Sequence, residues 1–473
     1  MAAHALHTTP YSGTWYPADP SELHALLDRL FRASESRIGG WLAPRAIGFV
    51  VPHAGLIYSG VVAASAFRHI AAQKPRRIVL MGFSHRGGRR GLFLPEAEAI
   101  QTPVGQTLLD AEAMAALLPR PEFRRVEEDL VCDHSVEIQL PLLQRAAPEA
   151  QIVPVYVNRP DPLSRAEAAR SLASLAGPDT VFVASSDFTH YGRDFGFQPF
   201  PVDGRTAGRL SDLDNAVIDA AGSVDSEMFL DSIRETSATV CGVEPIALLL
   251  ETLRCLDGPE VFQRRLDYQT SGDITGDYHN SVSYATLGYF PRTSFEIDPD
   301  GQALLLASAR RTLATYQETG RRKPIPLEDS HPALAAHLGA FVTIYVAGDP
   351  RGCVGQVTAV EPLSRLIPEL ALSAALDDSR FESLTARDTN LTVEISILTP
   401  MKRVRDRSAF LVNEHGALLK SGFHQGLLLP QVATERAWDA DQFFAALARK
   451  AGAHPKVYDD PGAKLYVFRA QHF

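Results

Sequence analysis

Continuous apolar runs of strand length recur in the first 290 residues of the chain. They are rich in β-branched residues and span 46–53, 77–83, 152–157 and 180–186. Unbroken apolarity is typical of strands covered on both faces, as in a mostly parallel sheet flanked by helices. Stretches of helical character lie around these runs, at 20–32, 60–72, 107–118, 164–175 and 244–256. The alternation predicts an α/β domain.

The pattern changes where Pro291, Pro299 and Gly301 cluster. Beyond this point we predict helices at 303–317, 364–376 and 440–451 and strands at 341–348 and 392–398. The second part therefore reads as a separate α+β domain, joined to the first at about 292–300. The predicted domains span 1–294 and 298–473.

Composition excludes several classes of protein. Of the 473 residues, 45% are hydrophobic and 22% are charged, as in a typical soluble protein, which excludes wholesale disorder. The formal net charge of −10 argues against nucleic acid or an anionic membrane as partners, because both require dense patches of lysine and arginine. No apolar run approaches the roughly 18–20 residues that span a bilayer.

The cysteines and the N-terminal segment point to the cytoplasm. Four cysteines, Cys132, Cys241, Cys255 and Cys353, lie far apart and form no CxxC pair. We interpret each as a thiol, a ligand or a packing residue rather than as half of a disulfide. The first 17 residues lack the basic start and apolar stretch of a signal peptide. We therefore expect a cytoplasmic protein.

Polar residues that bind metals or transfer protons follow the strongest strands of the first domain. These residues are His53, His85, Asp187 and His190. In open α/β sheets, sites gather beyond the carboxyl ends of the strands, so side chains distant in sequence converge there. A single histidine is more often a cap or a packing residue. Three histidines at such positions favour a shared site.

Two other segments allow two interpretations each. His134 and Glu137 lie on one face if their segment is helical. One interpretation is that they line a pocket. The other is an ordinary helix start, capped by Asp133 or Ser135. Cys241 lies just before a predicted helix, whose N-terminus lowers the pKa of a thiol and favours a thiolate ligand. Its alternative role is that of a small buried hydrophobic residue. Spacing alone does not decide.

Six short motifs appear in order along the first domain. They are GTWYPADP (13–20), VPHAGLIYSG (51–60), GFSHRGG (82–88), DHSVEIQLPLLQ (133–144), SSDFTHYG (185–192) and CGVEPI (241–246). Together they resemble the Memo family over about residues 8–291. That family is similar in fold to the class III extradiol ring-cleaving dioxygenases of the LigB type. The resemblance implies an extradiol dioxygenase-like sheet.

The resemblance also implies a site. In those dioxygenases two histidines and a carboxylate hold Fe(II), and another histidine handles protons. By resemblance, His53 and His85 are metal ligands, and Cys241 stands where the carboxylate is expected. His190 matches the proton-handling histidine, and we expect Asp187 to orient it. Three further residues are expected to line the pocket: Trp15, His134 and Glu137.

The thiolate affects the choice of metal and of reaction. Fe(II) is the expected ion, although a thiolate also suits copper(I) and zinc. Three functions remain open: a mononuclear metal-dependent oxidoreductase, a metal-assisted hydrolase, and a binding or scaffolding protein whose cleft takes a small molecule or a peptide. Memo genes in microbes commonly accompany a radical-SAM protein, so the resemblance implies such a partner.

The second domain resembles the AMMECR-type domain over roughly 300–473. Its motifs include GAFVTIYVAGDPRGCVG (339–355), LTVEISILTP (391–400) and GLLLPQV (426–432). Arg351 and Cys353 belong to the first of these motifs and allow two interpretations. The first is an anion-binding arginine beside a reactive thiol. The second is a tight turn that contains a buried cysteine and a salt-bridged arginine. We favour a role in binding over one in catalysis.

Overall fold

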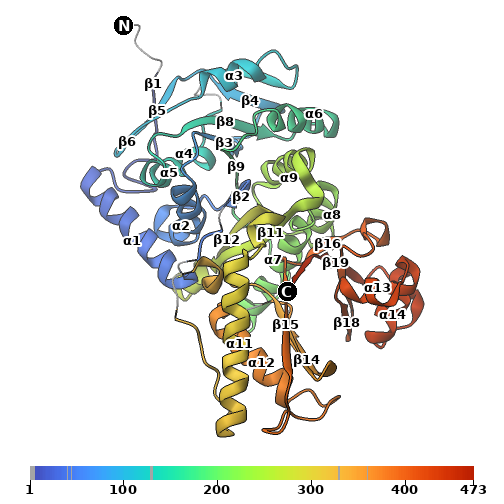
Figure 1. The fold of residues 1–473 in the computed structure, drawn as a ribbon. Helices are drawn as coiled ribbons and strands as arrows, with labels where there is room; N and C mark the ends of the chain where they lie inside the picture. Colours follow the sequence, from blue (N-terminus) through green and yellow to red (C-terminus); the bar gives the residue numbers. More distant parts are fainter. Residues whose placement is uncertain (1–5, 40, 44, 128–130, 329–330, 359–360) are drawn as a thin grey trace. The chain divides into compact units, whose positions relative to one another are not determined.

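The computed structural model describes residues 6–39, 41–43, 45–127, 131–328, 331–358 and 361–473. The first five residues of the N-terminal segment considered for a signal peptide lie outside this description. The chain divides between Ser294 and Phe295 into two compact units. Each unit is described by itself, and Figure 1 shows their helices and strands.

The first unit is built on one large sheet, which has nine strands among the described residues. Along its main path the order is β10-β12-β2-β9-β3-β8-β4-β7, and β11 pairs with β12. The strands are β2 (Gly48–Val51), β3 (Arg77–Gly82), β4 (Gly91–Pro95), β7 (Phe123–Val126), β8 (Gln151–Asn158), β9 (Thr180–Ser185), β10 (His190–Gly192), β11 (Val261–Thr270) and β12 (Asn280–Pro291).

The centre of this sheet is parallel and both of its sides carry antiparallel strands. β2, β9, β3 and β8 pair in parallel, and they are the four strands predicted from the apolar runs. β12 is antiparallel to β2, β10 and β11, and β4 is antiparallel to β8. The predicted α/β class with a helix-flanked sheet is confirmed, but the sheet is more mixed than the apolar runs indicated.

Helices cover both faces of the sheet. Successive strand residues point to opposite faces. In β2, Gly48 faces Leu249 of α9, whereas the ring of Phe49 lies 6.0 Å from that of His69 in α2. α2 and α9 therefore lie on opposite faces. The helices are α1 (Pro20–Ile38), α2 (Leu56–Gln73), α3 (Ala111–Leu117), α4 (His134–Glu137), α5 (Leu140–Ala146), α6 (Pro162–Ala173), α7 (Thr206–Ala221), α8 (Ser226–Thr236), α9 (Val243–Asp257) and α10 (Ser271–Thr275).

The helix predicted at 107–118 begins later than expected. Thr107 and Leu108 belong to β6 (Gly105–Leu108), which forms a small sheet with β5 (Ala99–Thr102) and β1 (Leu6–Thr8). The Asp110 side chain accepts a hydrogen bond from the backbone N–H of Ala113. This cap starts α3 at Ala111.

The second unit is α+β, as predicted. Two four-stranded antiparallel sheets have the orders β14-β13-β15-β20 and β16-β19-β17-β18. The strands are β13 (Ala340–Val346), β14 (Asp349–Gln356), β15 (Leu391–Leu398), β16 (Lys402–Val404), β17 (Gly416–Ser421), β18 (His424–Leu428), β19 (Lys464–Phe468) and β20 (Ala470–His472). The helices are α11 (Pro299–Thr319), α12 (Leu363–Leu376), α13 (Gln431–Arg436) and α14 (Ala440–Lys450).

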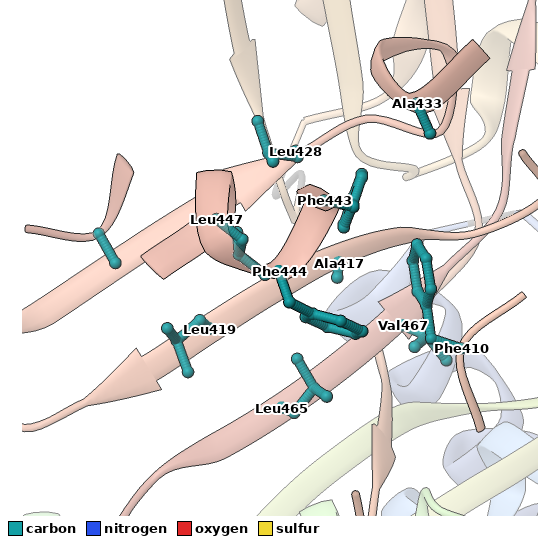
Figure 2. Packing of buried hydrophobic residues seen from close by; sticks show 11 residues of the cluster. Phe410, Ala417, Leu419, Leu428, Ala433, Phe443, Phe444, Leu447, Leu465 and Val467 are labelled. Atoms are coloured by element: carbon teal, nitrogen blue, oxygen red, sulfur yellow. The ribbon is translucent and has the colours of Figure 1, made fainter. Parts of the chain in front are cut away.

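An aromatic cluster fills the core beside the second of these sheets. Figure 2 shows Phe443, Phe444 and Leu447 of α14 facing side chains of β17 and β19. The ring centroids of Phe410 and Phe443 are 4.6 Å apart, and Phe443 is fully buried. This unit therefore has a core of its own.

Within the part of the chain that the structure describes, each helix is too short or too polar to cross a membrane.

Because each unit has its own core, we expect fragments 1–294 and 295–473 to fold separately. Each should give a near-ultraviolet circular dichroism spectrum of packed aromatic residues and a cooperative thermal transition. Within 295–473, the Phe443→Ala variant should lose about 3–5 kcal/mol of stability in urea denaturation, because it leaves a cavity among the rings. A molten or insoluble fragment would mean that the two units share a core.

Candidate metal centre

Three strands of the large sheet end side by side. β2 and β9 run parallel with Val51 opposite Ser185, and β3 and β9 run parallel with Met81 opposite Ala184. The chain therefore leaves all three strands at one edge of the sheet, where sites of α/β proteins are usually built. The residues that follow the three strands at this edge include His53, His85 and Asp187.

His53 is buried and is held through its backbone and its ring. Its backbone N–H donates to Asp187 Oδ1 over 2.7 Å, and its Nδ1 lies 3.1 Å from Ser185 Oγ. Its Nε2 lies 3.1 Å from Cys241 Sγ. Burial lowers the pKa of His53 well below its ordinary value, so the ring is neutral. A neutral imidazole with Nε2 directed at a thiol is a suitable donor for a metal ion.

Cys241 is held against the end of β9. Its Sγ accepts a hydrogen bond from the backbone N–H of Asp187 over 3.1 Å, and the next residue, Gly242, donates its N–H to Ser186 Oγ. Burial, followed by the charge of Asp187, raises the pKa of the Cys241 thiol. The lowered pKa expected from the helix N-terminus is therefore wrong. α9 begins two residues later, at Val243, and burial outweighs its dipole.

Asp133 fixes the position of His85. The His85 backbone N–H donates to Asp133 Oδ2 over 2.9 Å, and His85 Nδ1 lies 2.8 Å from Asp133 Oδ1. Burial opposes ionisation of this carboxyl. The hydrogen bond from His85 and the charge of His134 nevertheless lower the pKa of Asp133 to about 2. Since the carboxylate occupies Nδ1, the other ring nitrogen of His85, Nε2, is available for a ligand.

His134 lies beside these rings. Its ring stacks on that of His85 with centroids 4.0 Å apart and on that of Trp15 with centroids 4.2 Å apart. Burial lowers the pKa of His134 to about 4. His134 thus contacts the candidate ligand His85, and Trp15 contacts His134.

Among the described residues, two of the groups of side chains whose ligand atoms lie within 4.8 Å of one another contain His53. The first consists of His53, His85 and His134, and the second of His53, Asp187 and Cys241. His85 and Cys241 thus fall in different groups, which share His53. His134 and Asp187 are additional donors beyond the three that the resemblance implies.

His190 is oriented by Thr239, and the expectation that Asp187 orients it is wrong. His190 Nδ1 lies 3.0 Å from the Thr239 carbonyl oxygen, and the His190 backbone N–H donates to Thr239 Oγ1. The chain between Asp187 and His190 makes no tight turn. Phe188 and Thr189 instead form backbone hydrogen bonds with Ser283 of β12, which keeps the chain extended. The Asp187 carboxylate instead accepts from the backbone N–H groups of His53 and Ala54.

Comparison with known families agrees with the motifs. The sequence model of the family described as Memo-like protein matches residues 8–288, more than half of the chain. The chain belongs to the Memo family. A second family model, described as AMMECR1, matches residues 306–473, so a Memo domain is joined to an AMMECR1 domain. Both predicted families are confirmed.

Similar proteins occur in archaea and animals. The MEMO1 family protein MK0963 of Methanopyrus kandleri is 30% identical over 291 residues, which cover 58% of this chain and 96% of that protein. The MEMO1 family protein Ta0237 of Thermoplasma acidophilum is 33% identical over 280 residues, with the same coverage. The Protein memo-1 homolog of Caenorhabditis elegans is 29% identical over 289 residues, covering 58% and 80%. The solved structure of the uncharacterized protein PH0010 of Pyrococcus horikoshii has 33% sequence identity and a TM-score of 0.36. The match covers 37% of this chain and 92% of that chain.

A cavity opens over the candidate centre of the Memo domain. It has a volume of about 450 Å³ and is lined by both His85 and Cys241. Three arginines, Arg89, Arg90 and Arg159, also line it. The cavity thus joins two candidate ligands to a basic wall.

Glu137, expected to line the pocket, is not among the residues that line this cavity. It is fully buried, and its Oε1 lies 2.9 Å from Nε2 of His7 in the N-terminal strand β1. α4 consists of a single turn, so His134 stacks on the ring of His85 while the carboxylate of Glu137 pairs with His7.

Arg351 and Cys353 belong to the AMMECR1 domain and lie within strand β14, so the tight turn considered for them is wrong. Arg351 pairs with Asp388 over 3.2 Å. Cys353 Sγ accepts a hydrogen bond from Thr343 Oγ1 over 3.2 Å, and the Cys353 backbone N–H donates to Asp378. The salt-bridged arginine matches one of the two interpretations.

Sequence reasoning missed the residues that hold the donors. The sequence indicates Asp133 as a helix cap, and it does cap α4 by accepting a hydrogen bond from the backbone N–H of Ser135. It also binds His85, which the sequence analysis did not predict. Its position next to His134 was an available signal. The roles of Ser185 and Thr239 left no such signal, because they depend on contacts between distant segments.

Substitution of Gly242 tests how tightly Cys241 is placed. A Cβ at position 242 would lie 2.5 Å from Ser186 Cβ and 2.6 Å from the Ser185 carbonyl oxygen. Gly242→Ala should therefore push the Cys241 loop away from β9 and lower stability by about 1–3 kcal/mol in thermal denaturation.

Gly208→Ala in α7 is the matched control, because no atom lies within 4 Å of a Cβ there. That variant should be as stable as the parent or up to about 1 kcal/mol more stable. Equal stability of Gly242→Ala and its parent would show that the loop is loosely held.

Proposed function

We propose that the Memo domain is a mononuclear metal-dependent oxidoreductase that holds Fe(II) through His53, His85 and Cys241. The observation that carries the proposal is the 3.1 Å approach of the buried His53 Nε2 to Sγ of the half-buried Cys241, in the same group of converging donors as Asp187. The same distance suits a hydrogen bond between the two side chains, and the metal measurements below separate that alternative from a shared metal ion.

The donor set fits a transition-metal ion. Burial keeps His53 neutral, and the Asp133 carboxylate on Nδ1 of His85 fixes the orientation of the ring and leaves Nε2 for the metal. Imidazole and thiolate ligands suit iron, copper and zinc. Bound Fe(II) would supply open coordination positions at which substrate and O₂ are brought together.

His190 is the proposed proton-transfer residue. A carbonyl oxygen can only accept, so the hydrogen bond to Thr239 places the proton of the neutral ring on Nδ1. Burial lowers the pKa of His190, which favours this neutral form near pH 7. Nε2 then carries the lone pair and can accept a proton from a substrate hydroxyl.

Asp187 has a positioning role in this proposal. It holds the backbone of His53 through Oδ1 and donates its own backbone N–H to Cys241. Burial raises the pKa of Asp187 to about 7. Its contacts support a role in fixing two metal ligands.

The basic wall of the cavity favours an anionic substrate. Arg89, Arg90 and Arg159 line the same cavity as His85 and Cys241. Guanidinium groups bind carboxylates and phosphates through paired hydrogen bonds. 3,4-Dihydroxybenzoate combines a catechol with a carboxylate and is a suitable first probe. A radical-SAM protein, implied by the resemblance alone, remains the predicted partner.

Removing a ligand should remove the metal. Protein purified anaerobically should contain iron by elemental analysis, and His53→Ala and Cys241→Ala should lose most of it. Asp133→Asn should weaken metal affinity by roughly 10–100-fold, because such supporting carboxylates have effects of that size.

The control variants are His24→Ala and Cys255→Ala, which replace exposed residues of the same types in the same domain. Both should keep the parent's metal content. If His53→Ala and Cys241→Ala also keep it, the metal is bound elsewhere and the proposal fails.

His190→Ala separates an enzyme from a metal-stabilised binding protein. Its metal content should stay near that of the parent, whereas O₂ uptake with 3,4-dihydroxybenzoate should fall by about 10²–10⁴-fold, the range for loss of a general acid–base group.

Metal loss in His190→Ala equal to that in His53→Ala would make His190 a fourth ligand and the site a closed structural one. Removal of the metal with a chelator should abolish O₂ uptake, and re-addition of Fe(II) should restore it. Uptake that persists without metal would contradict the proposal.

A further inference from the structure

A second group of converging donors lies beside the same segment of the Memo domain. It consists of His7, Cys132 and Glu137, whose ligand atoms all lie within 4.8 Å of one another. His7 belongs to β1, Glu137 to α4, and Cys132 directly precedes the Asp133 cap of α4. None of the three belongs to either group that contains His53.

Glu137 points to a ligand at this place. Its side chain is fully buried, and its Oε1 lies 2.9 Å from His7 Nε2. Among the described residues, Glu137 Oε2 has no hydrogen-bond partner. A buried carboxylate with an unsatisfied oxygen is costly, and a bound cation would satisfy it.

The three donors have the chemistry of a zinc site. Imidazole, thiolate and carboxylate are its usual protein ligands, with bond lengths of about 2.0–2.3 Å. A tetrahedral ion with such bonds puts neighbouring ligand atoms about 3.4–3.6 Å apart, so the observed group needs only small side-chain movements. The pKa of the buried Tyr156 is raised well above its ordinary value. Burial is the main cause, and the charges of the nearby Cys132 and Glu137 add to it. Tyr156 is therefore a neutral phenol beside the group.

We propose that His7, Cys132 and Glu137 form a second metal site, for Zn²⁺ or a divalent ion of similar softness. The side chain of His7 is 13% exposed, so an ion can reach the group from its side. A bound ion would fasten β1 to α4. It would also stabilise the chain on both sides of Asp133, the residue that holds His85. The competing interpretation is a His7–Glu137 ion pair without a metal.

The test uses a full-length background that lacks the first centre. In His53→Ala/Cys241→Ala protein, Co²⁺ added as a spectroscopic substitute for Zn²⁺ should produce a thiolate-to-cobalt charge-transfer absorption that saturates at about one equivalent. Further substitution Cys132→Ala should abolish this absorption, and Cys255→Ala, at an exposed cysteine, should leave it unchanged. Because the first centre is absent, this result does not depend on whether the proposed function is correct.

His7→Ala and Glu137→Gln give the second measurement. If the site exists, each should weaken Zn²⁺ binding in the same background by about tenfold or more. His7 is on a short terminal strand, so this variant should fold even if Cys132→Ala does not. Unchanged Zn²⁺ affinity with a lower Tm of the metal-free protein would identify a simple ion pair and overturn the proposal. A cobalt–thiolate absorption that is absent from the background, or that survives Cys132→Ala, would also overturn it.

Discussion

The parallel register of β2, β9 and β3 is the constraint on which the candidate centre depends. Because Val51 lies opposite Ser185 and Met81 opposite Ala184, the chain leaves the three strands at the same height. A shift of one residue would turn every following side chain to the other face of the sheet. The hydrogen bond from the His53 backbone N–H to Asp187 ties two of these strand ends together. The distances among His53, Asp187 and Cys241 follow from that arrangement.

Burial gives the centre its electrostatic character. Burial lowers the pKa values of His53 and His134, and it raises those of Asp187 and Cys241. Each shift favours the neutral form of its group. Asp133 is the exception, since His85 and His134 stabilise its charge. The pocket therefore holds neutral donors with one fixed anion behind His85, which favours a cation over an anion at its centre.

The sequence was sufficient for the parts that depend on local pattern and insufficient for those that depend on distant pairing. The central strands could be predicted because burial on both faces requires unbroken apolar runs. β10 and β7 are three and four residues long and carry polar residues, so the antiparallel additions left no comparable pattern. The meeting of His53 with His85 could be inferred from their positions after strands. The partner of His190 could not, because it depends on the pairing of Thr189 with Ser283 of β12, nearly a hundred residues away.

The segment from Cys132 to Glu137 contacts both the candidate metal centre and the N-terminal strand β1. Asp133 and His134 contact His85, while Glu137 contacts His7 of the N-terminal strand. These contacts share one short turn of helix, so a displacement on one side changes the free energy of the other. By thermodynamic linkage such an influence is reciprocal. If a ligand in the cavity changes the affinity for a ligand at His7 by some factor, the ligand at His7 changes the affinity of the cavity by the same factor. The N-terminal strand is therefore joined, through His7 and Glu137, to the same turn of helix that holds His85.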